Sequence, residues 1–235
     1  MIMPERNREV APGARAPVLS SALLARIHEL NRDYVELLIA QRSMTDAGGP
    51  IESLPAKLLE GLGDLTPGWR RTLAATPFAL YSLGFDDAHF WLEALSNAQS
   101  QPLAVSVEVR YGASSATAPM QAALCEIVLF LAWHTAAVNR VAARVLFALP
   151  DELAGPLIDA PLWRLRQIAM HCPDLMTPRW PANPAFWPDL IRFAASGDSR
   201  RLETTQLLGN QLIAVELEGL GPRTVKRLSR NRLRF

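Results

Sequence analysis

The feature that most constrains the fold is an apolar stretch from Met120 to Leu149. Along it, residues recur with the i, i+3, i+4, i+7 spacing of one helix face. In the first half the opposite face is apolar too, whereas Arg140 and Arg144 interrupt the second half. We therefore predict a long central helix that is buried over its first half and reaches solvent over its second. The predicted inner face comprises Leu124, Ile127, Val128, Leu131, Thr135, Val138, Ala142, Val145 and Leu149.

A membrane span is the alternative interpretation of this stretch. A window over residues 120–138 is long enough to cross a bilayer, and Glu126 and His134 are its only unfavourable residues there. A buried helix of a bundle accounts better for the rising polarity toward Arg144 and leaves no glutamate in lipid. We therefore favour a core helix and expect no membrane association.

The composition is that of an ordinary soluble globular protein. Of the 235 residues, 49% are hydrophobic and 20% are charged, which is enough for one large domain or two small ones. The net charge of +1 gives no overall attraction to nucleic acid, so an electrostatic partner needs a local patch. Two cysteines are too few for a disulfide framework, and the N-terminus lacks the apolar segment of a secretory signal. We expect a cytoplasmic protein with a disordered tail over residues 1–19.

Helical patterns flank the central stretch on both sides. An amphipathic helix is predicted from Ala22 to about Met44, with Ser20 or Ser21 as its cap. A helix after Phe85 is expected to be capped by Asp86. The prolines within residues 171–188 predict a rigid irregular loop. The remaining predicted helices span 55–62, 64–75, 189–195 and 200–217.

Two segments have the pattern of strands. Aromatic and branched residues dominate 78–85, and apolar residues alternate strictly with polar ones over 103–111. A lone strand leaves its amide groups unpaired, so the second segment needs a partner. Either 78–85 lies beside it, or Val105, Val107 and Val109 lie on a strand that pairs with its own copy in a second subunit, forming a homodimer.

Residue pairs recur at a nearly constant separation. Leu54-Pro55 recurs as Leu149-Pro150, 95 residues later, and Phe90-Trp91 recurs as Phe186-Trp187, 96 residues later. Such agreement favours duplication over coincidence in a chain rich in Leu and Ala. We therefore predict a mainly α fold, a helical bundle of two tandem similar units with a minor β element. The first unit covers 20–112, the central helix and second unit cover 113–218, and a basic C-terminal tail covers 219–235.

Short motifs in the first unit point to a known family. In order they are Ile27-His28-Glu29-Leu30-Asn31, Tyr34, Leu38-Ile39-Ala40-Gln41-Arg42, Leu65-Thr66, Leu73-Ala74 and Leu83-Gly84-Phe85-Asp86-Asp87. Over residues 22–95 this order resembles the flagellar transcriptional regulator FlhD. The resemblance implies a mainly helical, dimerising protein that acts in transcription with a partner regulatory protein. Family members are single units, so we expect the two units here to form within one chain the pairing that the family makes between chains.

The C-terminal run from Leu217 to Leu228 resembles the hairpin of helix-hairpin-helix DNA-binding modules. Glycines there let the backbone approach a phosphate, and the amides and dipole of the following helix favour its negative charge. The alternative is a plain helix end followed by a solvated basic tail. The residues predicted to bind nucleic acid are Gly219, Gly221, Arg223, Thr224, Lys226, Arg227 and Arg230.

Catalytic and metal-binding motifs were not found. The chain has no GxSxG, Walker loop, CxxC pair or HExxH, and the adjacent His171 and Cys172 point apart in regular structure. His134 is expected to be a satisfied core histidine. The remaining aromatic and basic cluster either stacks nucleic-acid bases or, as we favour, fills a proline-rich core. Its members are Trp163, Trp180, Phe186, Trp187, Arg164, Arg166 and Arg179.

Together these patterns predict a non-enzymatic bacterial regulator of transcription without cofactor or metal. It would contact DNA through the C-terminal hairpin, through a partner, or through both. The alternative is a protein-interaction or assembly adaptor that has no nucleic-acid role.

Overall fold

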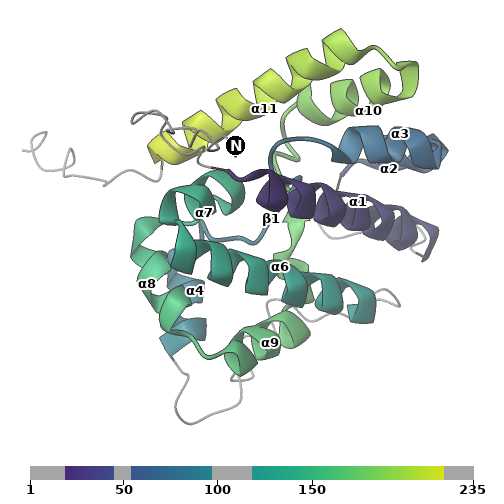
Figure 1. The fold of residues 1–235 in the computed structure, drawn as a ribbon. Helices are drawn as coiled ribbons and strands as arrows, with labels where there is room; N and C mark the ends of the chain where they lie inside the picture. Colours follow the sequence, from purple (N-terminus) through teal and green to yellow (C-terminus); the bar gives the residue numbers. More distant parts are fainter. Residues whose placement is uncertain (1–18, 45–53, 97–117, 220–235) are drawn as a thin grey trace, which may run out of the picture.

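Helices dominate the structure, as the sequence predicts. The computed structural model describes residues 19–44, 54–96 and 118–219 (Figure 1). The first part contains α1 (Ser21–Met44), α2 (Ala56–Asp64), α3 (Pro67–Ala74), β1 (Tyr81–Ser82) and α4 (Ala88–Ser96). The second contains α6 (Ala118–Val138), α7 (Arg140–Phe147), α8 (Asp151–Asp159), α9 (Leu162–His171), the 3-10 helix η2 (Pro173–Leu175), β2 (Thr177–Pro178), α10 (Phe186–Ser196) and α11 (Ser199–Gly219). The mainly α class with a minor β element is therefore confirmed.

The helix α1 begins and packs as its pattern requires. The Ser20 hydroxyl accepts a hydrogen bond from the backbone N–H of Leu23 at 3.2 Å, which caps the first turn. One face of α1 is buried in the core, including Ile27 and Tyr34. The fully buried Asn31 lies among them. Its amide donates to the carbonyl of Ala74 at the end of α3 and to that of Phe78, and its oxygen accepts from the backbone N–H of Leu80. Asn31 thereby fixes the chain that leads into β1.

The predicted central helix is broken into two. Asn139 leaves the helical conformation with φ −151°, and its side chain accepts from the backbone N–H of Ala142 at 3.0 Å. A single helix over 120–149 was therefore wrong, because asparagine stabilises a new helix start better than a continuing helix. The inner face was right for Leu124 and Val128 but wrong for Ile127, which is 53% exposed.

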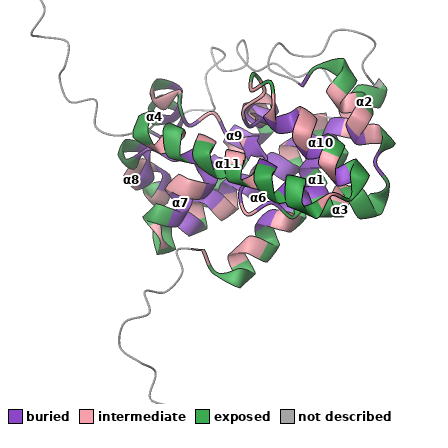
Figure 2. Cartoon of the chain, turned by 90° about the horizontal axis from the view of Figure 1, so that it is seen from above, coloured by how far each residue is buried: buried purple, intermediate pink, exposed green. Residues whose placement is uncertain are grey.

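Further along α6, Val138 and His134 are also exposed, so the histidine is no core residue. The packed face of α6 lies against α1, α7, α8, α9 and η2. By length and composition α6 is the one described helix apolar enough to cross a membrane, and a core helix passes the same test. Figure 2 shows the buried residues concentrated between the helices and the outward face of α11 largely exposed.

The two halves repeat the same order of elements. The bounds of α2 and α8 differ by 95 residues, and those of β1 and β2 by 96. Pro55 and Pro150 occupy equivalent positions before α2 and α8. Two indole groups repeat a hydrogen bond as well, since Trp91 donates to Leu83 O and Trp187 donates to Arg179 O.

The two strands pair with each other, and this pairing joins the halves. The strands β1 and β2 are antiparallel, with Tyr81 opposite Pro178 and Ser82 opposite Thr177. Residues 81 and 82 are equivalent to 177 and 178, so the register has a local two-fold symmetry. The helices cross over in the same way, because α4 packs against α8 and α10 packs against α2 and α3. Contacts therefore run from each predicted unit into the other.

This pairing corrects two predictions. The strand over 78–85 is reduced to two residues, and its partner comes from 171–188, which we predicted to be irregular throughout. Proline is tolerated because the Arg179 N–H donates to Leu80 O at 2.9 Å, and bonded and non-bonded pairs alternate in an antiparallel ladder. Pro178 therefore occupies a non-bonded position, where its missing N–H is not needed. The predicted strand 103–111, with Val105, Val107 and Val109, lies outside the described residues.

Candidate functional site

A cavity of about 750 Å³ opens beside the two-stranded sheet. The strands form part of its wall, together with the turn after β1, η2 and the last turns of α11. Its lining includes Gly84, Asp174, Trp180, Glu216 and Gly219. The cavity thus lies where the two halves meet and where the described part of the C-terminal helix ends.

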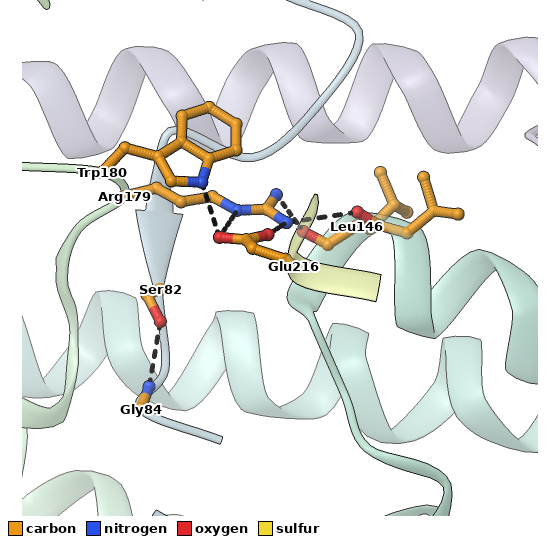
Figure 3. Close-up of polar contacts among 7 residues, drawn as sticks. Ser82, Gly84, Leu146, Arg179, Trp180 and Glu216 are labelled. Atoms are coloured by element: carbon orange, nitrogen blue, oxygen red, sulfur yellow. Dashed lines mark hydrogen bonds and ion pairs between the residues drawn. The ribbon is translucent and has the colours of Figure 1, made fainter. Parts of the chain in front are cut away.

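Arg179, Trp180 and Glu216 form one wall of the cavity, and Figure 3 shows the contacts that the Arg179 side chain makes with its neighbours. Its side chain is almost fully buried, and its guanidinium donates to the carbonyl oxygen of Leu146 at 3.0 Å and to both carboxylate oxygens of Glu216. The end of α7 carries partial negative charge from its unpaired carbonyls, which favours a cation there. Arg179 therefore ties β2 to the ends of α7 and α11.

Trp180 completes this wall. Its backbone has φ 54°, in the left-handed region that few side chains adopt. The indole N–H donates to Glu216 at 2.6 Å, and the guanidinium of Arg179 lies 4.7 Å from the ring centroid. The indole packs edge-on against Phe78 and Phe186, with centroid distances of 5.5 and 4.8 Å. Glu216 is therefore fully engaged and its charge is balanced by Arg179.

A second group of lining residues, the acidic wall, carries carboxylates. It comprises Asp86, Asp87 and Asp174. Burial raises the pKa of the Asp174 carboxyl above its usual value, and a hydrogen bond from the Gln121 amide at 3.2 Å opposes this effect. Asp87 rather than the predicted Asp86 caps α4, because its oxygen accepts from the Phe90 N–H at 3.0 Å. A cavity with such a wall suits a cationic group.

Gly84 also lines the cavity and is the counterpart of Trp180. The two residues are 96 positions apart, and both have a positive φ. The turns that follow repeat the same hydrogen bonds: Asp87 N–H donates to Gly84 O at 3.1 Å, and Asn183 N–H donates to Trp180 O at 3.0 Å. Where one turn carries an indole, the other carries no side chain. This difference leaves space over Gly84, where the Ser82 hydroxyl accepts from the Gly84 N–H (Figure 3).

The aromatic cluster proposed for base stacking is mostly core. Phe186 and Trp187 are fully buried, as is Arg164, so they fill the interior as we favoured. The exceptions are Trp163, which is 50% exposed, its exposed neighbour Arg166, and the partly buried Trp180, which lines the cavity.

Metal and thiol chemistry have no support within the described ranges. No group of three or more His, Cys, Asp or Glu residues there could hold a metal ion. Burial raises the pKa values of the Cys125 and Cys172 thiols to about 12, so both thiols are protonated and unreactive at neutral pH. The His171 ring bonds to the backbone of its own helix at 2.8 Å.

Of the predicted nucleic-acid-binding residues, Gly219 lies at the end of α11 and lines the cavity. Gly221, Arg223, Thr224, Lys226, Arg227 and Arg230 lie outside the described residues. Sequence reasoning missed the cavity and the role of Glu216. The available signal was the separation of 96 residues, which aligns Gly84 with Trp180.

Comparison of the chain with protein-family models, curated proteins and solved structures gave no match.

Proposed function

We propose that this chain is a cytoplasmic regulator of transcription that contacts DNA through its basic C-terminal segment. The observation that carries the proposal is the separation of charge along the chain. The described residues contain 14 Lys and Arg against 18 Asp and Glu, whereas residues 220–235 contain six Lys and Arg and no acid. Phosphate contact is therefore assigned to this segment rather than to the helical body.

The interlocked halves add support. The resemblance to FlhD implies units that pair, and here β1 pairs with β2 while α4 and α10 each pack on the other half. One chain thus has the arrangement expected of two dimerised units. In this proposal the body is a scaffold for a partner regulatory protein, and the glycines at 219 and 221 bring the backbone close to DNA.

A salt titration of DNA binding tests the proposal. We expect full-length protein to bind duplex DNA with an affinity that falls steeply with salt. The triple variant Arg223→Gln, Lys226→Gln, Arg227→Gln should reduce the slope of log K against log salt by about 2.7, since each phosphate contact contributes about 0.9.

The control is a triple variant that loses the same number of positive charges from the helical body. Arg71, Arg140 and Arg200 are exposed on three helices of the body. Their triple substitution by Gln should leave the slope unchanged. Equal slopes for the two triple variants would refute contact through the C-terminal segment.

An adaptor function is the second candidate, favoured by an exposed apolar surface on α6 and α9. Ile127 and Met170 are 53% and 59% exposed, and Trp163 shares the outer face of α9 with Met170 and Arg166. Arg166 forms an ion pair with Glu126 at 3.7 Å, which brings the two outer faces together. Two results together would favour this function. Full-length protein would fail to bind DNA at low salt, and a partner protein that co-purifies with the wild type would no longer co-purify with the variant Ile127→Glu.

A further inference from the structure

The cavity beside the sheet lies at one of two equivalent turns, and the two turns differ in the side chain that they carry. Trp180 fills one of two equivalent places with an indole held between Phe78 and Phe186. At the other place Gly84 has no side chain, and the nearest atom to an added Cβ is Leu175 Cδ2 at 3.8 Å. A Cβ there would make ordinary van der Waals contact with Leu175, but the positive φ of Gly84 disfavours a side chain, so the turn itself puts none into the cavity.

The charge of the cavity indicates what kind of group fits. Glu216 is neutralised by Arg179, so we attribute the negative charge of the cavity to Asp86 and Asp174 of the acidic wall. Within the described part of the chain, no Lys or Arg forms an ion pair with Asp86 or Asp174. The Gln121 amide donates to Asp174, and burial nevertheless raises the pKa of its carboxyl, so a nearby cation would further favour the charged form. A basic side chain would complete the site.

The C-terminal segment begins at this cavity. Gly219 lines it and is followed directly by residues 220–235, which carry six Lys and Arg and several apolar residues. Arg223 is four residues beyond Gly219, and an extended chain covers about 13 Å over that distance. The first basic residues therefore have the reach to cross the cavity, and the short tether gives them a high effective concentration there.

We propose that the cavity between Gly84, Asp86, Asp174 and Trp180 is the docking site of the chain's own C-terminal segment 220–235. Its basic residues pair with the acidic wall, and its apolar residues cover the space over Gly84. This docking does not depend on nucleic-acid binding. If the segment also binds DNA, the acidic wall and phosphate compete for the same arginines.

Limited trypsin digestion of the full chain at low salt tests the docking. Trypsin cleaves after Lys and Arg, and a docked segment is cleaved only while it is released. We expect the variant Asp86→Asn, Asp174→Asn to lose residues 220–235 about five times faster than wild type, from two partly exposed ion pairs. Asp87 is left unchanged because it caps α4.

The matched control is Glu152→Gln, Asp159→Asn, which removes two exposed charges on α8, outside the cavity lining. It should be cleaved at the wild-type rate. If the cavity variant does not fold, wild-type protein is compared at low and high salt, with a free peptide of the same sequence to correct for trypsin activity. Two results would overturn the proposal. One is cleavage of the wild type at the same rate as the cavity variant. The other is a ratio of wild-type to free-peptide cleavage that is the same at low and at high salt.

Discussion

Three helical glycines test the crossover packing, because an added methyl group meets a different environment at each. At Gly209 in α11, a Cβ would lie 2.2 Å from Phe78 Cζ, and the ring is held by Trp180 and Phe186. At Gly61 in α2, it would lie 3.1 Å from Ile191 Cγ2 of α10. At Gly63, also in α2, its nearest neighbour is the flexible end of the Arg42 side chain at 3.8 Å.

The magnitudes decide the sign of each effect. Replacing glycine by alanine inside a helix stabilises by about 0.5–1 kcal/mol, and overpacking a core destabilises by about 1–3 kcal/mol. Gly209→Ala should lower the free energy of unfolding by about 2 kcal/mol, because neither the helix backbone nor the enclosed ring yields easily. Gly61→Ala should lie within about 0.5 kcal/mol of wild type, and Gly63→Ala should be about 0.5 kcal/mol more stable.

Thermal and urea unfolding followed by circular dichroism measure this series. For a chain of this size, the loss at Gly209 corresponds to a fall in Tm of about 4–8 °C. Gly63→Ala is the control for helix propensity alone. A variant Gly209→Ala with the wild-type Tm or higher would show that α11 does not lie on Phe78, and the wall that carries Glu216 would then be misplaced.

Two further predictions concern buried groups. Arg179→Met should lower the free energy of unfolding by about 3–5 kcal/mol, because it leaves the Glu216 carboxylate and two carbonyls of α7 without their donor. Glu216→Gln keeps an acceptor and should lower the free energy of unfolding by about 1–2 kcal/mol. Urea unfolding that gives the reverse order would contradict the central role of the arginine. Because burial raises the pKa values of Cys125 and Cys172 from 9.0 to about 12, their contribution to stability is full below pH 9 and is lost as pH rises from 9 to 12. The free energy of unfolding of the variant Cys125→Ala, Cys172→Ala should therefore fall less steeply with pH over that window than that of the wild type, by up to about 1.4 kcal/mol per pH unit for each thiol. Identical slopes of unfolding free energy against pH would argue against buried thiols.

Local features of the fold were predictable from the sequence because their causes are local. Ser20 caps α1, and apolar spacing marks the buried face of that helix. The break at Asn139 was missed because the spacing of apolar residues continues through it, and only the side-chain cap shows that a new helix begins. Spacing also fails at Ile127, since it cannot show which side of an all-apolar helix finds a partner.

The site was less predictable because it depends on contacts distant in sequence. Nothing near Tyr81 indicates that its partner is Pro178, 97 residues away in a proline-rich loop. Glu216 has the ordinary pattern of an exposed helical residue, and only the folded chain brings it to Arg179. The repeat was visible from Phe90-Trp91 and Phe186-Trp187, but its crossed arrangement was not.

The presence of two similar halves in one chain allows such a site to exist. A symmetric homodimer places the same residue at both equivalent positions, so a tryptophan in one turn would require a tryptophan in the other. In a single chain the two positions differ, and here Trp180 fills one while Gly84 leaves the other open. For the same reason Arg179 in one half can have Leu83 as its counterpart in the other. The ion pair between Arg179 and Glu216 therefore forms on one side only. The cavity, with its clamped wall and its acidic wall, is therefore a property of the joined chain that a dimer of either half would lack.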